Sequence, residues 1–275
     1  MALRLRSQTR LAILPPSRLA VPEVFRNVDV CTERYRHLLS NMQRLRGSAY
    51  QADGAIHRGD LTADGRHRSS IDQRSWHVLS LDANDGVVAC LRYLEESHVS
   101  GFDGLSVRQA ALARCPVHGA NFRRAVESEI EGARCAAIGF GEVGGWAVRE
   151  DHRLTPDSLG IVLATYALLE LLGSCAGVAT ATFRHHSAEI LRRIGLAALR
   201  AEGREIPPYY DPQYGCQMQA LRFDSRFPNP RYRNWIGALM GDLANSPVVC
   251  RENSEGVFGR VWNGMDALEP VLVPA

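Results

Sequence analysis

The sequence predicts an α/β protein in which helices cover both faces of one mixed sheet. From residue 134 onward, apolar-rich runs typical of strands alternate with segments whose apolar residues follow the helical period. A hairpin signal precedes this alternation at residues 76–94. With 275 residues, 45% of them hydrophobic and 23% charged, the chain is long enough to bury the core that such a sheet needs.

In the first half of the chain, the pattern predicts a long helix, a loop and a hairpin. Residues 51–70 are polar and contain three glycines, and loops of this length often cover binding sites. Asn84-Asp85-Gly86 is a typical tight turn between two strands. The expected elements are a helix at 33–50, strands at 76–81 and 87–94, and helices at 106–114 and 121–133.

The second half predicts strands and helices in turn. The helix expected at residues 159–172 is apolar almost all round, which indicates that it is buried. The other expected elements are strands at 134–138, 142–149, 178–183 and 216–223, and helices at 187–199 and 232–243.

Composition excludes several functions. All 32 basic residues are arginine, so no lysine is present to form a Schiff base or a P-loop. A net charge of +2 argues against nucleic-acid binding through bulk charge. The longest apolar run, at residues 161–172, is too short to insert into a membrane. Seven scattered cysteines without a Cys-x-x-Cys pair fit reduced thiols, so we expect a cytoplasmic protein.

Two motifs suggest ligand chemistry that their context does not support. Residues 139–144, Gly-Phe-Gly-Glu-Val-Gly, match a dinucleotide-binding pattern, but a strand and not a helix follows them. They are better explained by a bulged or splayed strand. His185 and His186 are adjacent and lack the spacing of metal ligands, so a capped helix start or a surface pair is expected there, and no metal.

Three stretches resemble the core of the GNAT acyltransferases. They are residues 142–151 (EVGGWAVRED), the buried helix that follows, and residues 181–195 (ATFRHHSAEILRRIG). Residues 207–224 (PPYYDPQYGCQMQALRFD) are similar to long-chain N-acyl amino acid synthases, relatives of the acyl-homoserine-lactone autoinducer synthases. The resemblance implies a GNAT-like fold, in which a mixed twisted sheet contains a splayed strand pair.

The resemblance runs from about Glu33 to Pro230, and the 25 residues at the start of the chain are rich in arginine and proline. We expect residues 1–25 to form a flexible leader and residues 26–230 to form the GNAT-like acyltransferase domain. Residues 231–275 are expected to be a helical or irregular extension that packs on this domain.

Two departures from typical GNAT enzymes favour the synthase branch. Acetyl-CoA enzymes carry a glycine-rich pyrophosphate loop at the position of residues 153–160. Here this segment has one glycine and contains Pro156 and Asp157. A carboxylate at this position would repel a pyrophosphate. Leu191 and Arg192 occupy the positions where many GNAT enzymes have a tyrosine that protonates the leaving thiolate. Both departures resemble the autoinducer-synthase branch, in which an acylated carrier protein is the acyl donor.

The branch implies roles for several residues. Glu142 would anchor or deprotonate the acceptor amine, with a structural carboxylate as the alternative. Backbone N–H groups around Trp146, Ala147 and Val148 would stabilise the oxyanion and line the pantetheine path. Gly145 stands where the branch carries an arginine, which favours an ordinary amino acid over lactone-type chemistry.

Other polar residues would bind substrate or carrier. Arg92 would pair with the acceptor carboxylate, and Asp72 would hold the amine or brace Arg92. The full substrate-binding set is Arg46, Tyr50, Asp72, Arg92 and Arg184, and structural ion pairs or surface roles are the alternative. Arg192, Arg193 and Arg200 would dock the acidic carrier, unless they form only a solvated face.

The function expected from these residues is N-acyl transfer. A medium- or long-chain acyl group would pass from acyl-carrier protein, or acyl-CoA, to the α-amine of an amino acid without a metal or redox cofactor. The alternatives are an acetyl-CoA-dependent N-acetyltransferase and a non-catalytic domain that binds an acyl chain or a partner.

Overall fold

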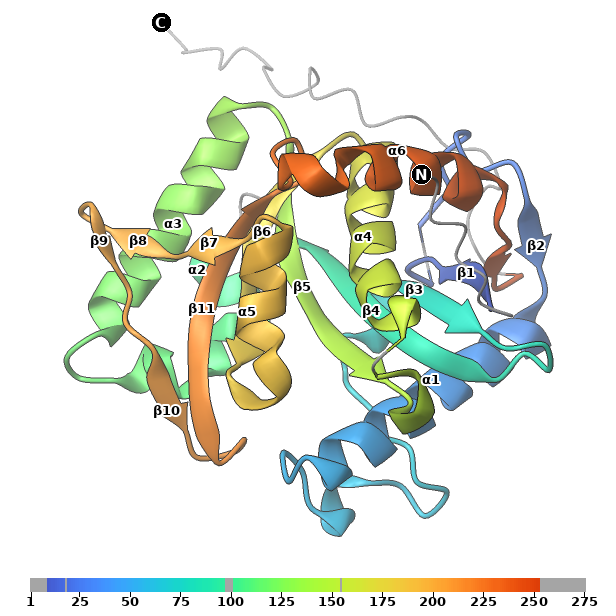
Figure 1. Ribbon diagram of the computed structural model, residues 1–275, viewed down its shortest axis with the longest axis horizontal. Helices are drawn as coiled ribbons and strands as arrows, with labels where there is room; N and C mark the ends of the chain where they lie inside the picture. Colours follow the sequence, from blue (N-terminus) through green and yellow to red (C-terminus); the bar gives the residue numbers. More distant parts are fainter. Residues whose placement is uncertain (1–8, 18, 97–100, 154, 253–275) are drawn as a thin grey trace, which may run out of the picture.

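A large mixed sheet forms the centre of the computed structural model, which describes residues 9–17, 19–96, 101–153 and 155–252. Its strands are β1 (Arg10–Leu14), β2 (Val28–Val30), β3 (Trp76–Leu81), β4 (Val87–Glu96), β5 (Gly139–Val148), β6 (Cys175–Thr182), β7 (Ala197–Ala198), β10 (Tyr209–Asp211), β11 (Cys216–Asp224) and β12 (Val248–Cys250). The order across the sheet is β10-β11-β6-β5-β4-β3-β1-β12-β2, and β7 adds to β11 (Figure 1). A separate ribbon pairs β8 (Arg200–Ala201) with β9 (Arg204–Glu205).

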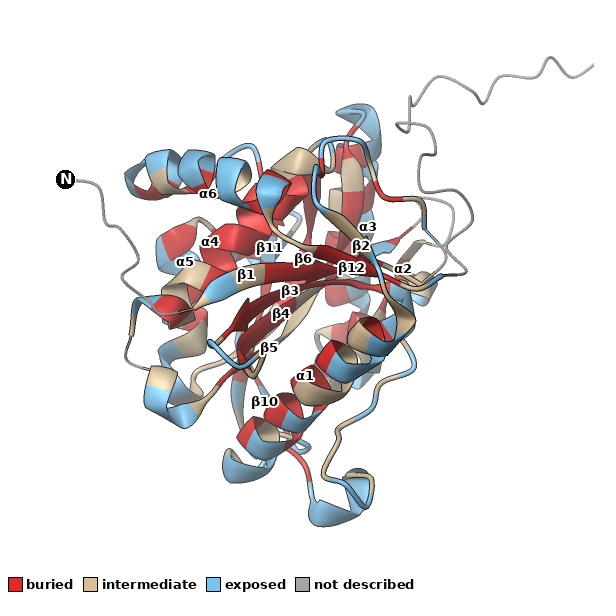
Figure 2. Cartoon of the chain, turned by 90° about the vertical axis from the view of Figure 1, so that its right-hand side faces the viewer, coloured by how far each residue is buried: buried red, intermediate tan, exposed pale blue. Residues whose placement is uncertain are grey.

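Helices cover both faces of this sheet, as the sequence predicted. The α-helices are α1 (Thr32–Ala52), α2 (Gly101–Gly104), α3 (Gly119–Cys135), α4 (Pro156–Leu171), α5 (Ser187–Ile194) and α6 (Arg233–Asn245). Short 3₁₀ turns are η1 (Arg58–Asp60), η2 (Asp72–Arg74), η3 (Ser106–Gln109), η4 (Ala111–Arg114), η5 (Glu150–His152), η6 (Arg184–His186) and η7 (Pro230–Tyr232). Helix α1 packs on one face, while α4 and α6 pack on the other (Figure 2).

Helix α4 lies in the core between the sheet and α6. Its residues Ile161–Leu169 are all buried, which explains the apolar sequence of this helix on every side. Helix α3 packs against the far part of the sheet, where Phe122 and Val126 contact the cluster that contains Met218 of β11. The predicted mixed α/β architecture is therefore confirmed.

Strand β1 contradicts the expectation of a flexible leader at residues 1–25. Ala12, Ile13 and Leu14 are fully buried, and the strand pairs along its whole length with β3. Ile13 also pairs with Val248 of β12, so residues near both ends of the described chain complete the sheet. Residues 1–8 and 253–275 lie outside the described part of the chain.

Three local predictions were wrong in extent or type. Residues 134–138 do not form a strand, because α3 continues to Cys135 and a turn at Ala137 then leads into β5. Residues 106–114 form the two turns η3 and η4 and not one helix. The helix expected at 187–199 ends at Ile194, because Gly195 adopts a φ of 138° that other residues rarely tolerate.

The expected splay of two neighbouring strands is present between β5 and β6. Their parallel pairing runs only from Gly139–Cys175 to Glu142–Val178. Beyond Glu142, β5 stays paired with β4 while β6 stays paired with β11, so the two strands separate. A bulge lies in the same part of β5, where Gly145 has a φ of 66°, as the glycine pattern predicted.

Within the described residues, no helix is both long enough and apolar enough to cross a bilayer. The same part of the chain contains no group of three His, Cys, Asp or Glu side chains arranged to hold a metal ion. His185 and His186 lie at the start of α5, where both have positive φ angles, and His186 is exposed.

Candidate functional site

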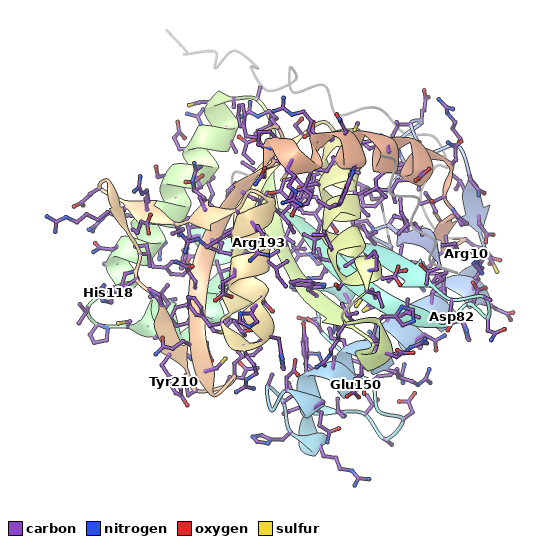
Figure 3. All side chains as sticks on the ribbon, viewed as in Figure 1. Arg10, Asp82, His118, Glu150, Arg193 and Tyr210 are labelled. Carbon is purple, nitrogen blue, oxygen red and sulfur yellow. The ribbon has the colours of Figure 1, made fainter. Side chains whose placement is uncertain are left out.

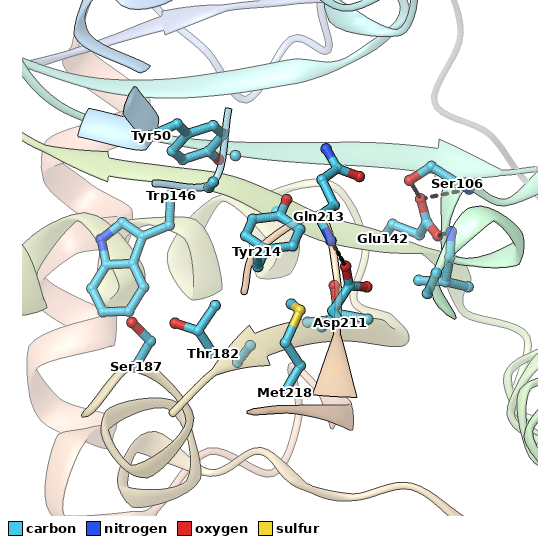
Figure 4. Close-up of a pocket in the computed structure, with 18 of the residues that line it drawn as sticks. Tyr50, Ser106, Glu142, Trp146, Thr182, Ser187, Asp211, Gln213, Tyr214 and Met218 are labelled. Carbon is cyan, nitrogen blue, oxygen red and sulfur yellow. Dashed lines mark hydrogen bonds between the residues drawn. The ribbon is translucent and has the colours of Figure 1, made fainter. Parts of the chain in front are cut away.

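A cavity of about 430 Å³ occupies the gap between β5 and β6. Its walls come from α1, the loop after α1, β4, β5, β6, the start of α5 and the turn between β10 and β11. Figure 4 shows Tyr50, Trp146, Thr182 and Tyr214 around this space. Segments far apart in the sequence therefore meet at one opening in the sheet.

Arg92 is a half-buried cation that forms no ion pair with a carboxylate of the described residues. It lines the cavity from β4, its Nε is buried without a hydrogen-bond partner, and no ion pair forms to it among the described residues. Burial lowers the pKa of Arg92, and the nearby charge of Arg46 lowers it further. Because a partly buried charge without a partner is costly, this position is suited to an anionic ligand.

Arg46 and Asp72 form a buried ion pair under the cavity. Arg46 donates to both carboxylate oxygens of Asp72, at 2.8 and 2.7 Å, and both side chains are almost fully buried. Gln43 and the backbone N–H of Ser69 also donate to Asp72. Asp72 therefore braces Arg46 and not Arg92, and it is not among the residues that line the cavity.

Glu142 lines the cavity at the point where β5 and β6 separate. Its Oε2 accepts hydrogen bonds from the backbone N–H of Ser106, at 2.9 Å, and from the Ser106 hydroxyl (Figure 4). Its Oε1 accepts one from the backbone N–H of Val107, at 2.6 Å. Glu142 is 2% exposed, and these donors fix the orientation of its carboxylate toward the segment that contains η3.

The three residues of β5 expected to supply oxyanion donors differ in position. Trp146 lines the cavity, whereas Ala147 and Val148 pair with Cys90 and Ala89 of β4 and pack in the core. Arg149 N donates to the Val88 carbonyl, so the alternation of an antiparallel ladder turns the N–H of Val148 away from β4. The same alternation turns the N–H of Ala147 toward β4.

Tyr50 and Arg184 close the cavity from two sides. The ring of Tyr50 lies 5.5 Å from that of His67, and burial raises the pKa of Tyr50. Arg184 donates to the backbone carbonyl of Asp53 just after α1, and also to that of Gly215. Arg184 thus connects the start of α5 with the loop after α1.

The arginines expected to dock a carrier lie outside the cavity. Arg192 and Arg193 are exposed on α5, and Figure 3 shows Arg193 on that helix. Arg200 is exposed in β8 and lies 3.5 Å from Glu205.

The structure adds site residues that the sequence analysis missed. Asp211 accepts a hydrogen bond from the backbone N–H of Gln213, and Tyr214 lines the cavity beside them. His67 and Ser106 also line it, from two irregular segments. The sequence analysis singled out the loop at 51–70 and the segment at 207–224 as a whole, but no periodic spacing marked these individual residues.

The N-terminus of α4 is occupied by the protein's own groups. Thr155 caps the helix, accepting from the backbone N–H of Asp157. The Asp157 carboxylate is buried and accepts from His152 Nδ1 at 2.7 Å and from Thr9 Oγ1 at 3.2 Å. This end of α4 therefore carries a negative group where the sequence departs from a pyrophosphate loop.

No protein-family model matches this sequence, and no curated protein does either. Among solved structures, the CoA-dependent acyl-homoserine lactone synthase BjaI is similar with a TM-score of 0.52 and 15% identity, over 90% of this chain and 96% of BjaI. FeeM, an N-acyl amino acid synthase from uncultured soil microbes, gives a TM-score of 0.45 and 9% identity, over 67% of this chain and 83% of FeeM. The predicted GNAT-like acyltransferase fold is thus confirmed, and at these identities the likeness shows the fold alone.

Proposed function

We propose that this protein is an N-acyltransferase. It transfers a medium- or long-chain acyl group from a thioester, on acyl-carrier protein or on CoA, to the α-amine of an amino acid. The observation that carries the proposal is the opening between β5 and β6, whose cavity holds the unpaired guanidinium of Arg92.

The opening provides a path for the donor. A pantetheine arm needs a narrow passage with exposed backbone, which two diverging strands supply. Apolar side chains that can contact an alkyl chain line the same cavity: Leu91, Val143, Trp146, Ala179, Ala181 and Leu191. This lining favours a longer acyl group over an acetyl group.

The acceptor is held by opposite charges. Arg92 forms a two-point pair with the α-carboxylate of the amino acid, which relieves the cost of its partly buried charge. Glu142 accepts a hydrogen bond from its ammonium group, because a carboxylate has about four acceptor sites and protein donors occupy three. The deprotonated amine nitrogen then attacks the thioester carbonyl carbon, and the C–S bond breaks as the amide forms.

The tetrahedral oxyanion of this reaction needs hydrogen-bond donors. Trp146 lines the cavity next to the bulge at Gly145, and its backbone N–H can serve as one of them. The reaction as written requires no metal or redox cofactor.

BjaI is described as CoA-dependent, so both donors remain part of the proposal. Two alternatives make different predictions. An acetyl-CoA enzyme would use the N-terminus of α4 for a pyrophosphate, which the buried Asp157 disfavours. A non-catalytic domain would bind acyl-pantetheine and yield no product.

The test is mass spectrometry of lipid extracts from cells that overproduce the chain, followed by assays of the purified protein. Donors are medium- and long-chain acyl groups on carrier protein and on CoA, with acetyl-CoA for comparison. Acceptors are the twenty amino acids and S-adenosylmethionine, which was seen bound to BjaI.

We expect N-acyl amino acids with the wild type, a large loss with Glu142→Gln, and little change with the exposed control Glu150→Gln. Binding of acyl-pantetheine without any product would contradict the proposal. Equal product from the wild type and Glu142→Gln would remove Glu142 from the reaction.

A further inference from the structure

His67 is the one imidazole among the cavity residues whose backbone is held on both sides. Its backbone N–H donates to the carbonyl of Gln43, at 3.0 Å, and its carbonyl accepts from Arg46 Nη2, at 2.6 Å. Both partners belong to α1, so the loop after α1 is tied to the helix at this residue.

Close packing reinforces this attachment. A Cβ atom on Gly47 would lie 2.6 Å from the Gly65 carbonyl oxygen and 3.2 Å from His67 N. Only a glycine in α1 therefore lets the loop approach this near. The ring of His67 packs at 5.5 Å from the ring of Tyr50, which fixes the side chain as well.

The imidazole ring of His67 has no hydrogen-bond partner among the described residues. Neither ring nitrogen of His67 forms a hydrogen bond to another described residue, and Nδ1 is buried. His185, the other histidine that lines the cavity, has its Nε2 3.0 Å from Asp53 Oδ1. A held but unpartnered imidazole in a cavity is suited to proton transfer with a ligand.

We propose that His67 is the general base of the acyl transfer, which removes a proton from the ammonium group of the acceptor. This inference rests on the proposed function. Arg92 holds the carboxylate of an α-amino acid, so the ammonium group, one carbon away, lies in the same part of the cavity. Glu142 then orients this ammonium group. Three hydrogen bonds from Ser106 and Val107 hold the Glu142 carboxylate in place.

The charges around His67 keep it neutral. Burial lowers its pKa, and the cation of Arg46 lowers it further, as does that of Arg92. Asp72 and Asp60 act in the opposite direction and are outweighed. A neutral imidazole at pH 7 has a lone pair ready to take the proton.

The proton balance is complete without another reactant. The acceptor ammonium gives one proton to His67, and its nitrogen lone pair forms the C–N bond with the thioester carbon. The C–S electrons leave with sulfur, which takes the second proton of the nitrogen and becomes a thiol. His67 releases its proton to water, so one H⁺ is produced in each turnover.

The test compares two acceptors in wild type, His67→Gln and the exposed control His37→Gln. One acceptor is the amino acid identified as substrate, and the other is its aminooxy analogue, whose nitrogen carries no proton at pH 7. For the amino acid we expect kcat to fall about 100-fold at pH 7 in His67→Gln, and the deficit to shrink as the pH approaches the pKa of the amine.

For the aminooxy acid we expect little loss, and we expect His37→Gln to match the wild type with both acceptors. Imidazole added to His67→Ala should restore part of the rate, which also shows that the variant is folded. An equal loss with both acceptors, or no loss with either, overturns the role of His67 while leaving the proposed function intact. A wild type that makes no N-acyl product refutes the proposed function itself, and the role of His67 with it.

Discussion

Arg46 of α1 contacts both carboxylate oxygens of Asp72, and this buried pair lies under the cavity. Burial tends to raise the pKa of Asp72, but hydrogen bonds from Arg46 and the charge of Arg46 outweigh it and lower the pKa to about 2. The carboxylate is therefore ionised whenever the protein is folded near neutral pH.

Replacing Asp72 by Asn should destabilise the protein. The variant leaves Arg46 as an uncompensated buried cation, which costs about 3 kcal/mol. Urea denaturation at pH 7 measures this change in the free energy of unfolding. The matched control is Asp64→Asn, which breaks exposed pairs with Arg44 and Arg66 and should have little effect. Similar losses in the two variants would refute a special role for the buried pair.

Arg92→Met should stabilise the folded protein and weaken binding of the acceptor. Removing a partly buried charge that has no partner should raise the free energy of unfolding by about 1 kcal/mol. Loss of the charged hydrogen bonds should raise the KM for the amino acid about 30-fold. Thermal melting and steady-state kinetics measure the two effects, and the exposed Arg36→Met on α1 should show neither. A destabilised Arg92→Met would mean that Arg92 is already paired within the protein.

Gly145→Ala should flatten the bulge of β5. Its φ of 66° costs an alanine about 1 kcal/mol, and the new Cβ would lie 3.3 Å from Arg92 Cβ. We expect lower stability and a lower kcat, because Trp146 and the adjacent backbone shift. Gly132→Ala in α3 is the control, since no atom lies within 4 Å of its new Cβ and a helical alanine should stabilise. An unchanged kcat in Gly145→Ala would separate the bulge from catalysis.

His77 should make stability depend on pH between 7 and 5. Burial lowers its pKa from 6.5 to about 4, so over this range the unfolded chain binds a proton that the folded protein does not. The stability contributed by neutral His77 is complete above pH 6.5 and is lost as the pH falls toward 4. The loss between pH 7 and 5 is about 2 kcal/mol. In urea denaturation, the free energy of unfolding of His77→Gln should lack this part of the pH dependence. The same pH dependence in the wild type and in His77→Gln would contradict this prediction.

Arg192→Glu combined with Arg193→Glu tests whether α5 docks a carrier protein. Both side chains are exposed, so the double variant should fold normally. We expect a higher KM for acyl-carrier protein and an unchanged KM for a short acyl-pantetheine, because only the carrier reaches α5. The control replaces Arg123 and Arg124, an adjacent pair on α3, by Glu. An equal effect on both donors would show that α5 does not recognise the carrier.

Elements with strong local patterns were predictable. The apolar spacing of α1, the turn between β3 and β4 and the apolar run of α4 each depend on neighbouring residues in the sequence. The glycines of β5 also predicted its bulge and its separation from β6, because a glycine in a strand weakens the regular ladder.

Strand β1 was not predictable in the same way. Its five residues, Arg10–Leu14, become a strand only through pairing with β3 and β12, which are distant in the sequence. The site likewise contains residues that the sequence predicted and residues that it did not. Arg46, Tyr50, Arg92 and Glu142 were expected together and do meet in the structure, whereas His67 comes from an irregular loop without periodic spacing.

The pairing of β1 and β2 with β12 has a consequence for the order of folding during synthesis. Among the described strands, β2 pairs only with β12, and Val248–Cys250 of β12 leave the ribosome after the rest of them. Until then, one edge of β1 and both edges of β2 lack a partner among these strands. A nascent chain that ends before residue 248 should therefore expose an unpaired, aggregation-prone sheet edge and depend on chaperones.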